Sequence, residues 1–386
     1  MNRDSRNKTD PVAGSDAGRG QQTGDVIPAS RLRDLLRPEV LAAFDRTAFE
    51  RDGYWAWEGI LTDAGRKQWT ASLQKLQQMH DSIIMDTDWA AIDFAGRGLP
   101  PPLPERITPE FLATCCGGSE KMRFMPGETD LYMRDQGLFG PGPALVTRGF
   151  ESQGLMPEKF PAAYDDFILD VITDHPQMMD LRRKLLGDRF VFDHCPMMNW
   201  APGSSGRRWH GHHYREGQYE VEDQIGSGSA ATTEFAQQQC VRTLCYPEGA
   251  IIEDGGELAV IPGAHLYRIP YKSNGDRTDD DAAMQKNWLP GKTHPVTGKP
   301  LEIRHLSLPP GSMVSFVHHM PHYVSPRKTE ASTRWGLLMA YRTPDPFASP
   351  AKWTSRVPAH WVERMEASGL LSSIARQVFE ADNSLD

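Results

Sequence analysis

The sequence predicts a mainly β fold with flanking helices, of the sandwich, jelly-roll or barrel type. The first sign is a series of short β-type runs after residue 189, and the second is the Gly and Pro turns that separate them. The third is that helical spacing of apolar residues occurs toward the two ends of the chain. Many short strands punctuated by turns are typical of packed or closed sheets.

The chain of 386 residues is long enough to bury a large core. We expect a single β domain over residues 28–386, with helical additions at its N-terminal side (28–188) and C-terminal side (357–380). Residues 1–27 are rich in Gly, Asp, Ser and Gln, a composition that predicts a disordered tail.

Helical spacing and turn residues place the elements of the two additions. We expect helices at Arg31 to Asp52, ended by Gly53; at Ala64 to Ile84, with Thr62 or Asp63 as the N-cap; at Pro161 to Leu186, interrupted at Pro176; and at His360 to Phe379. A short strand is expected between the first two helices, from Trp55 to Leu61.

Short apolar runs predict the strands of the central region. They are Phe190–Phe192, Met197–Trp200, Val241–Tyr246, Glu257–Ile261, Ile303–Leu308, Ser312–Val317 and Arg334–Tyr341. Residues 94–110 and 137–159 are dense in Gly and Pro and are expected to be loops. Residues 271–300 form a polar insertion, and long insertions on such scaffolds often act as lids or binding loops.

The composition excludes several classes of function. A formal charge of −9 argues against nucleic-acid or membrane-surface partners, and no apolar stretch approaches the length of a membrane span. The N-terminus lacks the apolar segment of a secretory signal. Five Cys, including the neighbours Cys115 and Cys116, form no CxxC pattern. We therefore expect a cytoplasmic protein with reduced thiols.

Three histidines suggest a metal site. His210 and His212 are two residues apart, so on an extended chain both side chains point to one face and can chelate one ion. About a hundred residues later come His318, His319 and His322, and the strand pattern alone does not decide which of them completes the set. Imidazole is a good ligand for iron, copper, nickel and zinc. The alternative is a His-rich surface loop.

Charged and aromatic side chains near these histidines are candidates for ligand binding. Arg334 opens an apolar strand, where it would bind either a protein carboxylate in a salt bridge or the carboxylate of a ligand. Arg207 and Arg208 are candidates for binding an anionic substrate, or else are solvated charges. Trp209 and Tyr214 would line an apolar pocket, or else belong to the core.

These pieces, in this order, resemble the phytanoyl-CoA dioxygenase family. The matching segments are Phe49–Tyr54, Trp209–His212, Gly255–His265, Pro310–Phe316, His322 and Arg334. The resemblance implies a double-stranded β-helix, which is a cupin-like jelly roll, and an Fe(II)- and 2-oxoglutarate-dependent oxygenase. It implies metal ligands at His210, His212 and His322, a 2-oxoglutarate contact at Arg334, and a structural role for His265. Oxygen and a small organic molecule would be the other substrates, with hydroxylation of an unactivated C–H bond as the reaction.

The departure from the family pattern is His212, because the family usually has Asp at this position. Three neutral imidazoles leave Fe(II) with its full charge, which should weaken metal binding and favour the ferrous state. Glu216 is a second source of a carboxylate. Two alternative functions stay open: a three-His iron dioxygenase that does not use 2-oxoglutarate, and a jelly roll that binds a metal or ligand without catalysis.

Overall fold

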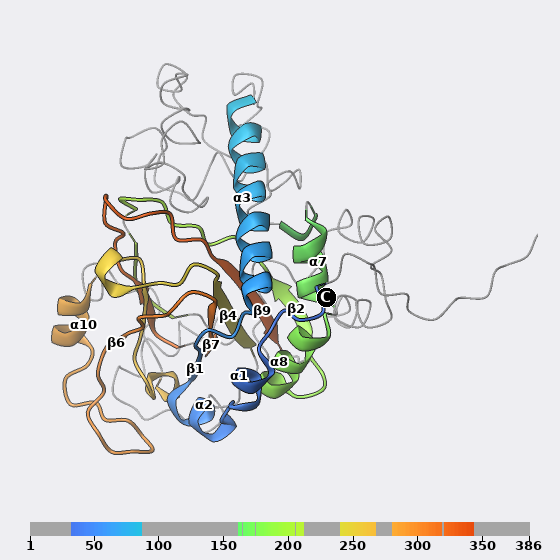
Figure 1. The fold of residues 1–386 in the computed structure, drawn as a ribbon. Coiled ribbons are helices and arrows are strands. Elements are labelled where there is room, and N and C mark those ends of the chain that lie inside the picture. Colours follow the sequence, from blue (N-terminus) through green and yellow to red (C-terminus); the bar gives the residue numbers. More distant parts are fainter. Residues whose placement is uncertain are drawn as a thin grey trace, which may run out of the picture.

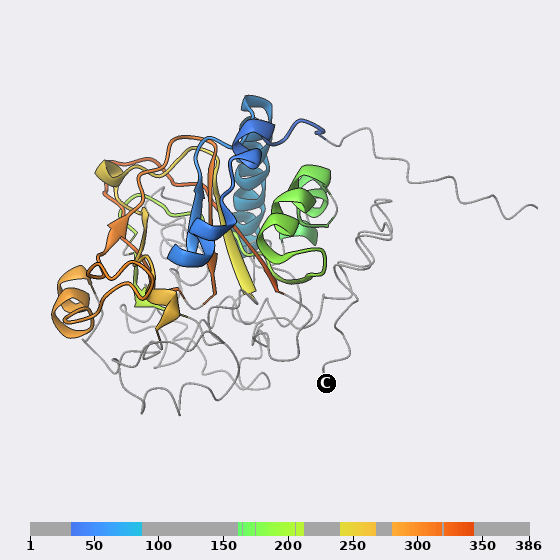
Figure 2. The same ribbon diagram turned by 90° about the horizontal axis from the view of Figure 1, so that it is seen from below.

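The computed structural model describes residues 32–86, 161–163, 165–173, 175–204, 206–211, 240–267, 280–318 and 320–342. Two antiparallel sheets dominate this part of the chain. The larger sheet has the order β1-β7-β4-β9-β2, and the smaller has the order β3-β8-β5-β6. Helices α3, α7 and α8 lie on one side of the larger sheet, and α10 lies at the opposite side of the molecule beside the smaller sheet (Figures 1 and 2).

The strand connections are those of a jelly roll. From β2 onward the chain alternates between the two sheets, except that β5 and β6 are neighbours in the smaller one. The larger sheet contains β1 (Tyr54–Trp57), β2 (Val191–His194), β4 (Cys240–Tyr246), β7 (Ser312–Val317) and β9 (Leu337–Arg342). The smaller contains β3 (Arg207–His210), β5 (Leu258–Val260), β6 (Arg304–His305) and β8 (His322–Val324). This topology confirms the predicted double-stranded β-helix.

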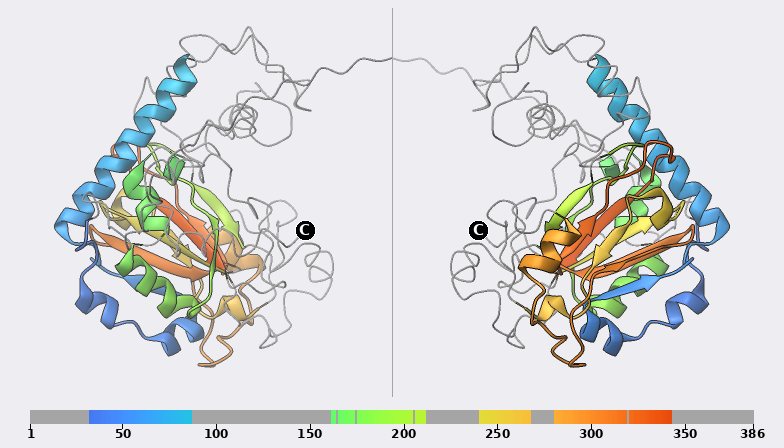
Figure 3. Two further views of the ribbon diagram at one scale, coloured as in Figure 1. Left: turned by 90° about the vertical axis from the view of Figure 1, so that its right-hand side faces the viewer. Right: turned by 90° about the vertical axis from the view of Figure 1, so that its left-hand side faces the viewer.

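The larger sheet is packed on both faces. Strand β4 is paired along its length with β7 and β9, and all of its residues are buried. On the outer face, Ser315 accepts a hydrogen bond from the Trp57 indole at 2.9 Å and lies 2.8 Å from the Thr243 hydroxyl. The hydroxyl of Tyr341 donates to the Ile172 carbonyl of α7. The first two contacts join β1, β7 and β4, and the third holds α7 against the larger sheet, whose helical cover is seen in Figure 3.

The N-terminal helices begin and end where local sequence chemistry predicts. They are α1 (Pro38–Ala42), α2 (Arg46–Asp52), α3 (Asp63–Asp86), η4 (Pro161–Ala163), α7 (Asp166–Thr173) and α8 (Pro176–Leu186). Gly53 ends α2 with φ of 79°, which is the left-handed cap that glycine favours. Thr62 caps α3 through the amide of Gly65, at 3.0 Å. No described helix is both long and apolar enough to cross a membrane.

The described part of the 271–300 insertion packs behind the smaller sheet. It contains α10 (Asp281–Asn287), and Met284 of this helix and Trp288, which follows it, form a separate apolar cluster with Trp209 and Ala259 of the sheet. The cluster faces away from the space between the two sheets, whose lining residues belong to the main core. The described residues 280–300 thus cover the outer face of the smaller sheet.

Some predicted boundaries differ from the observed ones. Residues 197–200 are not a strand, although Met197 and Trp200 make isolated bridges to Leu337 and Arg334. The helix expected over residues 31–52 is divided into α1 and α2, and the run at 303–308 shortens to β6. Outside the described residues lie the expected N-terminal tail, the loops at 94–110 and 137–159, and the C-terminal helix.

Candidate metal centre

The pairing of β3 with β8 brings His210 and His322 together. The two residues are register partners, and their ring centroids lie 4.1 Å apart with an interplanar angle of 50°. Gly206 precedes β3 with φ of 79°, and a Cβ at this position would lie 2.4 Å from the carbonyl oxygen of Val324. Glycine therefore allows the chain to enter β3 in close contact with β8.

Each of the two rings has its Nδ1 atom at hydrogen-bonding distance from a backbone carbonyl two residues earlier. Nδ1 of His210 lies 2.8 Å from the Arg208 oxygen, and Nδ1 of His322 lies 2.8 Å from the Met320 oxygen. A carbonyl only accepts, so Nδ1 carries the hydrogen in both rings. The neutral tautomer then has its lone pair on Nε2, the nitrogen through which each ring could bind a metal.

The surroundings hold both rings in the neutral form. Burial lowers the pKa of His210 to about 4, the hydrogen bond with the Arg208 carbonyl opposes that shift, and the charges of Arg207, Arg242 and Arg208 add to it. Burial also lowers the pKa of His322 well below its usual value, together with His210 and Arg242. Both imidazoles are thus free of a proton on Nε2 near neutral pH, so no proton must leave before a cation binds.

His322 is favoured over His318 as the distal partner. Nδ1 of His318 accepts a hydrogen bond from Nε of Arg242 at 3.2 Å and lies 3.5 Å from the thiol of Cys240. His322 instead packs against His210 and against the ring of Phe316, at a centroid distance of 5.0 Å. His319 lies outside the described residues.

The predicted third ligand, His212, lies outside the described residues. His212, Tyr214 and Glu216 follow the last described residue of β3 and its turn. Within the ranges that the structure describes, no group of three His, Cys, Asp or Glu side chains is close enough to hold a metal ion. The described part of the site is therefore a pair of imidazoles.

Arg334 is buried next to two aromatic rings, with 2% of its surface exposed. It is a bridge partner of Trp200, its guanidinium lies 5.3 Å from the Trp200 ring and 5.1 Å from the Tyr246 ring, and Nη2 is 3.5 Å from the Met198 oxygen. Burial raises the pKa of Tyr246, while Arg334 lowers it. The predicted Arg is thus in the core, at the start of the chain segment that becomes β9.

The other predicted contacts divide between the two faces of β3. Arg207 is partly buried and Arg208 is exposed, and both are close enough to influence His210. The Trp209 ring lies on the opposite face from His210, stacked on Tyr323 at 5.5 Å, and its indole donates to Asp281 at 2.9 Å. Among the described residues, Trp209 therefore packs behind the His pair, against Tyr323 and Asp281.

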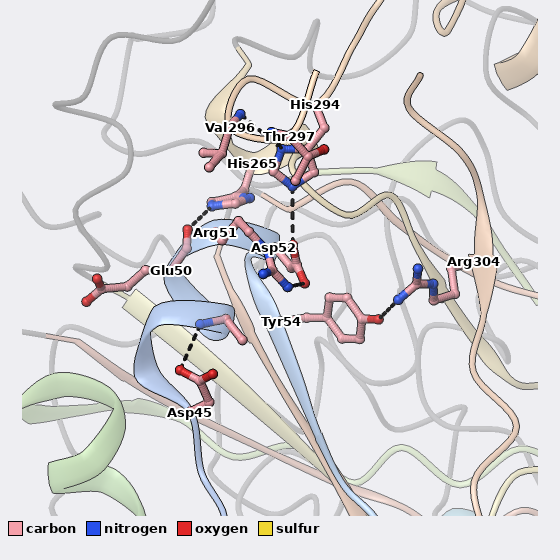
Figure 4. Close-up of polar contacts among 11 residues, drawn as sticks. Asp45, Glu50, Arg51, Asp52, Tyr54, His265, His294, Val296, Thr297 and Arg304 are labelled. Atoms are coloured by element: carbon pink, nitrogen blue, oxygen red, sulfur yellow. Dashed lines mark hydrogen bonds and ion pairs between the residues drawn. The ribbon is translucent and has the colours of Figure 1, made fainter. Parts of the chain in front are cut away.

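His265 has the structural surroundings that the resemblance implied. Its ring is 1% exposed, and its Nε2 atom lies 3.0 Å from the Glu50 carbonyl oxygen. Next to it, Asp52 binds both Arg51 and His294 (Figure 4). These contacts join the segment Phe49–Tyr54 to the Gly255–His265 segment, which explains why two such distant motifs occur together.

Comparison with known proteins gives only distant likenesses. No family model and no curated protein matches the chain. Among solved structures it is similar to EctD from S. alaskensis with 2-oxoglutarate and 5-hydroxyectoine (15% identity, 84% of this chain, 85% of that chain, TM-score 0.38). It is also similar to SnoN, a non-heme alpha ketoglutarate dependent epimerase from nogalamycin biosynthesis (11% identity, 84% of this chain, 91% of that chain, TM-score 0.44). A third similar structure is AviO1 from Streptomyces viridochromogenes Tue57 (16% identity, 82% of this chain, 98% of that chain, TM-score 0.39). At these values the likeness assigns neither family nor function.

The lowered pKa values predict how the metal-free protein responds to acid. An unfolded histidine binds a proton below about pH 6.5, whereas His210 in the folded state does so only near pH 4. Between these values the unfolded state binds more protons, so acidification should reduce stability. The expected result is a urea midpoint that falls more steeply in the parent protein than in His322→Gln between about pH 6.5 and pH 4.5. Parallel curves would contradict it.

Proposed function

We propose that this protein is a mononuclear iron oxygenase that uses 2-oxoglutarate and oxygen to hydroxylate a C–H bond of a small organic molecule. The observation that carries the proposal is the pair His210 and His322, because both rings are neutral and both have Nε2 as the lone-pair nitrogen. Their position on paired strands of a jelly roll supports it.

The donor set fits iron, among other transition metals. Imidazole nitrogen suits Fe, Cu, Ni and Zn, and two histidines with a third ligand leave open positions for substrates. We propose His212 as that third ligand, since its spacing from His210 places both side chains on one face of an extended chain. When bound, Fe(II) would supply the oxidising chemistry toward oxygen and 2-oxoglutarate.

Arg334 is the residue proposed to bind the distal carboxylate of 2-oxoglutarate. A guanidinium offers two parallel N–H groups to a carboxylate, and burial between Trp200 and Tyr246 strengthens that pairing by excluding water. The Tyr246 hydroxyl, which Arg334 influences, is a second donor for the same group. Arg207 and Arg208, at the partly exposed edge of β3, are proposed to attract an anionic substrate.

One competing function is favoured by a specific observation. His212 occupies the position where the phytanoyl-CoA dioxygenase family usually has Asp, and three neutral imidazoles are also the ligand set of an iron dioxygenase without 2-oxoglutarate. Formation of succinate from 2-oxoglutarate separates the two reactions. Membership of that family, one domain over residues 28–386 and a cytoplasmic location remain parts of the proposal.

The first prediction concerns the two described ligands. Substitution of His210 or His322 by Ala removes one of the few donors, so stoichiometric Fe(II) binding should be lost in either variant. The measurement is anaerobic metal titration with analysis of bound iron. His318→Ala is the matched control and should retain iron. Normal iron content in His322→Ala together with loss in His318→Ala would contradict the assignment of the distal ligand.

A second prediction concerns the third ligand. If His212 coordinates the metal, His212→Ala should weaken Fe(II) binding, whereas His212→Asp should preserve or strengthen it because a carboxylate adds a negative donor. The affinities are compared by competition with a chelator. Equal affinities in the parent and both variants would show that His212 is not a ligand, and Glu216 would become the candidate for the third ligand.

The third prediction concerns Arg334. Loss of one partner of a buried charge pair costs about 2–5 kcal/mol, so Arg334→Gln should weaken 2-oxoglutarate binding more than tenfold while Fe(II) binding is retained. Arg334→Lys should restore part of the affinity, because an ammonium is a point charge without the fork of donors. Both affinities are measured by titrating the anaerobic Fe(II) protein with 2-oxoglutarate and following the metal-to-ligand charge-transfer band.

Arg304→Gln is the control for the third prediction. Its guanidinium is exposed and donates to the Tyr54 hydroxyl at 2.7 Å, away from Arg334, so 2-oxoglutarate affinity should be unchanged. If the parent protein shows no charge-transfer band at full iron loading and millimolar co-substrate, the 2-oxoglutarate function is wrong and the three-His dioxygenase takes its place.

A further inference from the structure

The strand that contributes His210 has weak backbone support in the described part of the sheet. Strand β3 lies at the edge of the order β3-β8-β5-β6 and is paired with β8 alone. Its register with β8 shifts between the pairs Arg207–Val324 and His210–His322. An edge strand with an irregular ladder has fewer backbone hydrogen bonds to fix its position. Side-chain contacts must therefore contribute to holding His210 opposite His322.

Such contacts are present directly behind the His pair. Trp209 precedes His210 and Tyr323 follows His322, so both side chains project to the outer face of the sheet. Their rings stack with centroids 5.5 Å apart and an interplanar angle of 18°. Trp209 is 2% exposed. The stacked pair thus links β3 to β8 on the face opposite the two imidazoles.

A single carboxylate of α10 anchors this pair to the rest of the protein. Oδ1 of Asp281 accepts a hydrogen bond from the Trp209 indole at 2.9 Å, and Oδ2 lies 2.7 Å from Nε2 of His305. Nδ1 of His305 lies 2.6 Å from Oε1 of Glu257, whose other oxygen accepts from the Ser325 hydroxyl. The network therefore joins α10, β3 and β6 to the segments that flank β5 and β8.

The network is held by charge as well as by hydrogen bonds. Both nitrogens of His305 face carboxylates, so both donate and the ring is an imidazolium. Burial lowers the pKa of His305, but the hydrogen bonds and charges of Asp281 and Glu257 outweigh it and the pKa is raised. Hydrogen bonds between charged groups are stronger than those between neutral groups. Asp281 is thus held in place independently of Trp209.

We propose that Asp281, acting through the Trp209 indole, is a positioning residue that fixes His210 relative to His322 for metal binding. The inference rests on the proposed metal centre and adds to it a function for the insertion between β5 and β6. A metal tolerates only small displacements of its ligands, and the partners that orient ligands typically change metal affinity by 10–100-fold. Here the orientation passes through the strand that carries the ligand.

The test is a double-mutant cycle with metal affinity as its readout. Trp209→Phe keeps the stacked ring but removes the indole donor, and Asp281→Ala removes the acceptor. Each single variant should weaken Co(II) binding by about tenfold. Both changes break the same contact. The double variant should therefore lose no more Co(II) affinity than the single variant that loses most. Co(II) is titrated anaerobically, and its visible ligand-field spectrum reports the coordination of the ion.

The neighbouring residue supplies a matched control. Asp280 caps α10 by accepting from the amide of Ala283 at 2.8 Å, whereas the Trp209 indole donates to Asp281, and Asn is an equally good cap. Asp280→Asn should therefore bind Co(II) within about twofold of the parent. Circular dichroism and thermal unfolding of the metal-free variants confirm that every titration is made on folded protein.

The outcomes separate this inference from the proposed function. Parent-like Co(II) affinity and spectra in folded Trp209→Phe and Asp281→Ala, with binding lost in His210→Ala, would overturn the positioning role and leave the metal centre standing. Additive losses in the double variant would overturn the coupling through Trp209. A parent protein that binds no Co(II) would overturn the metal centre and the inference with it. Non-additive losses with an altered spectrum would support both.

Discussion

The antiparallel pairing of β3 with β8 is the constraint on which the candidate site depends, because it sets His210 opposite His322. Strand β8 is itself fixed by β5, whose Val260 is the register partner of His322 on its other side. Gly206 permits the close entry into β3. One register thus decides whether two histidines far apart in sequence lie together or apart, since a shift by one residue would turn a side chain to the other face.

The alternation of side chains across the smaller sheet gives its two faces different tasks. His210 and His322 lie on the inner face, where burial, together with nearby arginine charges, lowers the pKa of both imidazoles and keeps them neutral. Trp209 and Tyr323 lie on the outer face under the insertion. The inner face therefore carries the proposed metal centre, and the outer face carries the stacked pair and the charged network around His305.

The sequence alone predicts the fold class, and run length and turns place β4 and β7 almost to the residue. The resemblance names His210 and His322, which the fold brings together, and Arg334, which the fold buries. The sequence does not predict the packing of the insertion, because residues 280–300 are polar overall and only a few apolar side chains, Met284, Trp288 and Leu289, join the cluster on the sheet. The sequence also does not predict the His305 network, because Glu257, Asp281 and His305 lie far apart in the chain and form no sequence motif. An Asp at the start of a helix is usually an exposed residue of the first turn.

The position of β1 has a consequence for how the chain folds. Residues 54–57 pair with β7, and the Trp57 indole bonds to Ser315, 258 positions later. During synthesis β1 therefore cannot pair with β7 until most of the chain has left the ribosome. Contacts between such distant residues require large loops to close, which slows folding. Until then the apolar edge of β1 is a site for non-native association, and chaperones are expected to matter more for this protein than for a helical one of equal length.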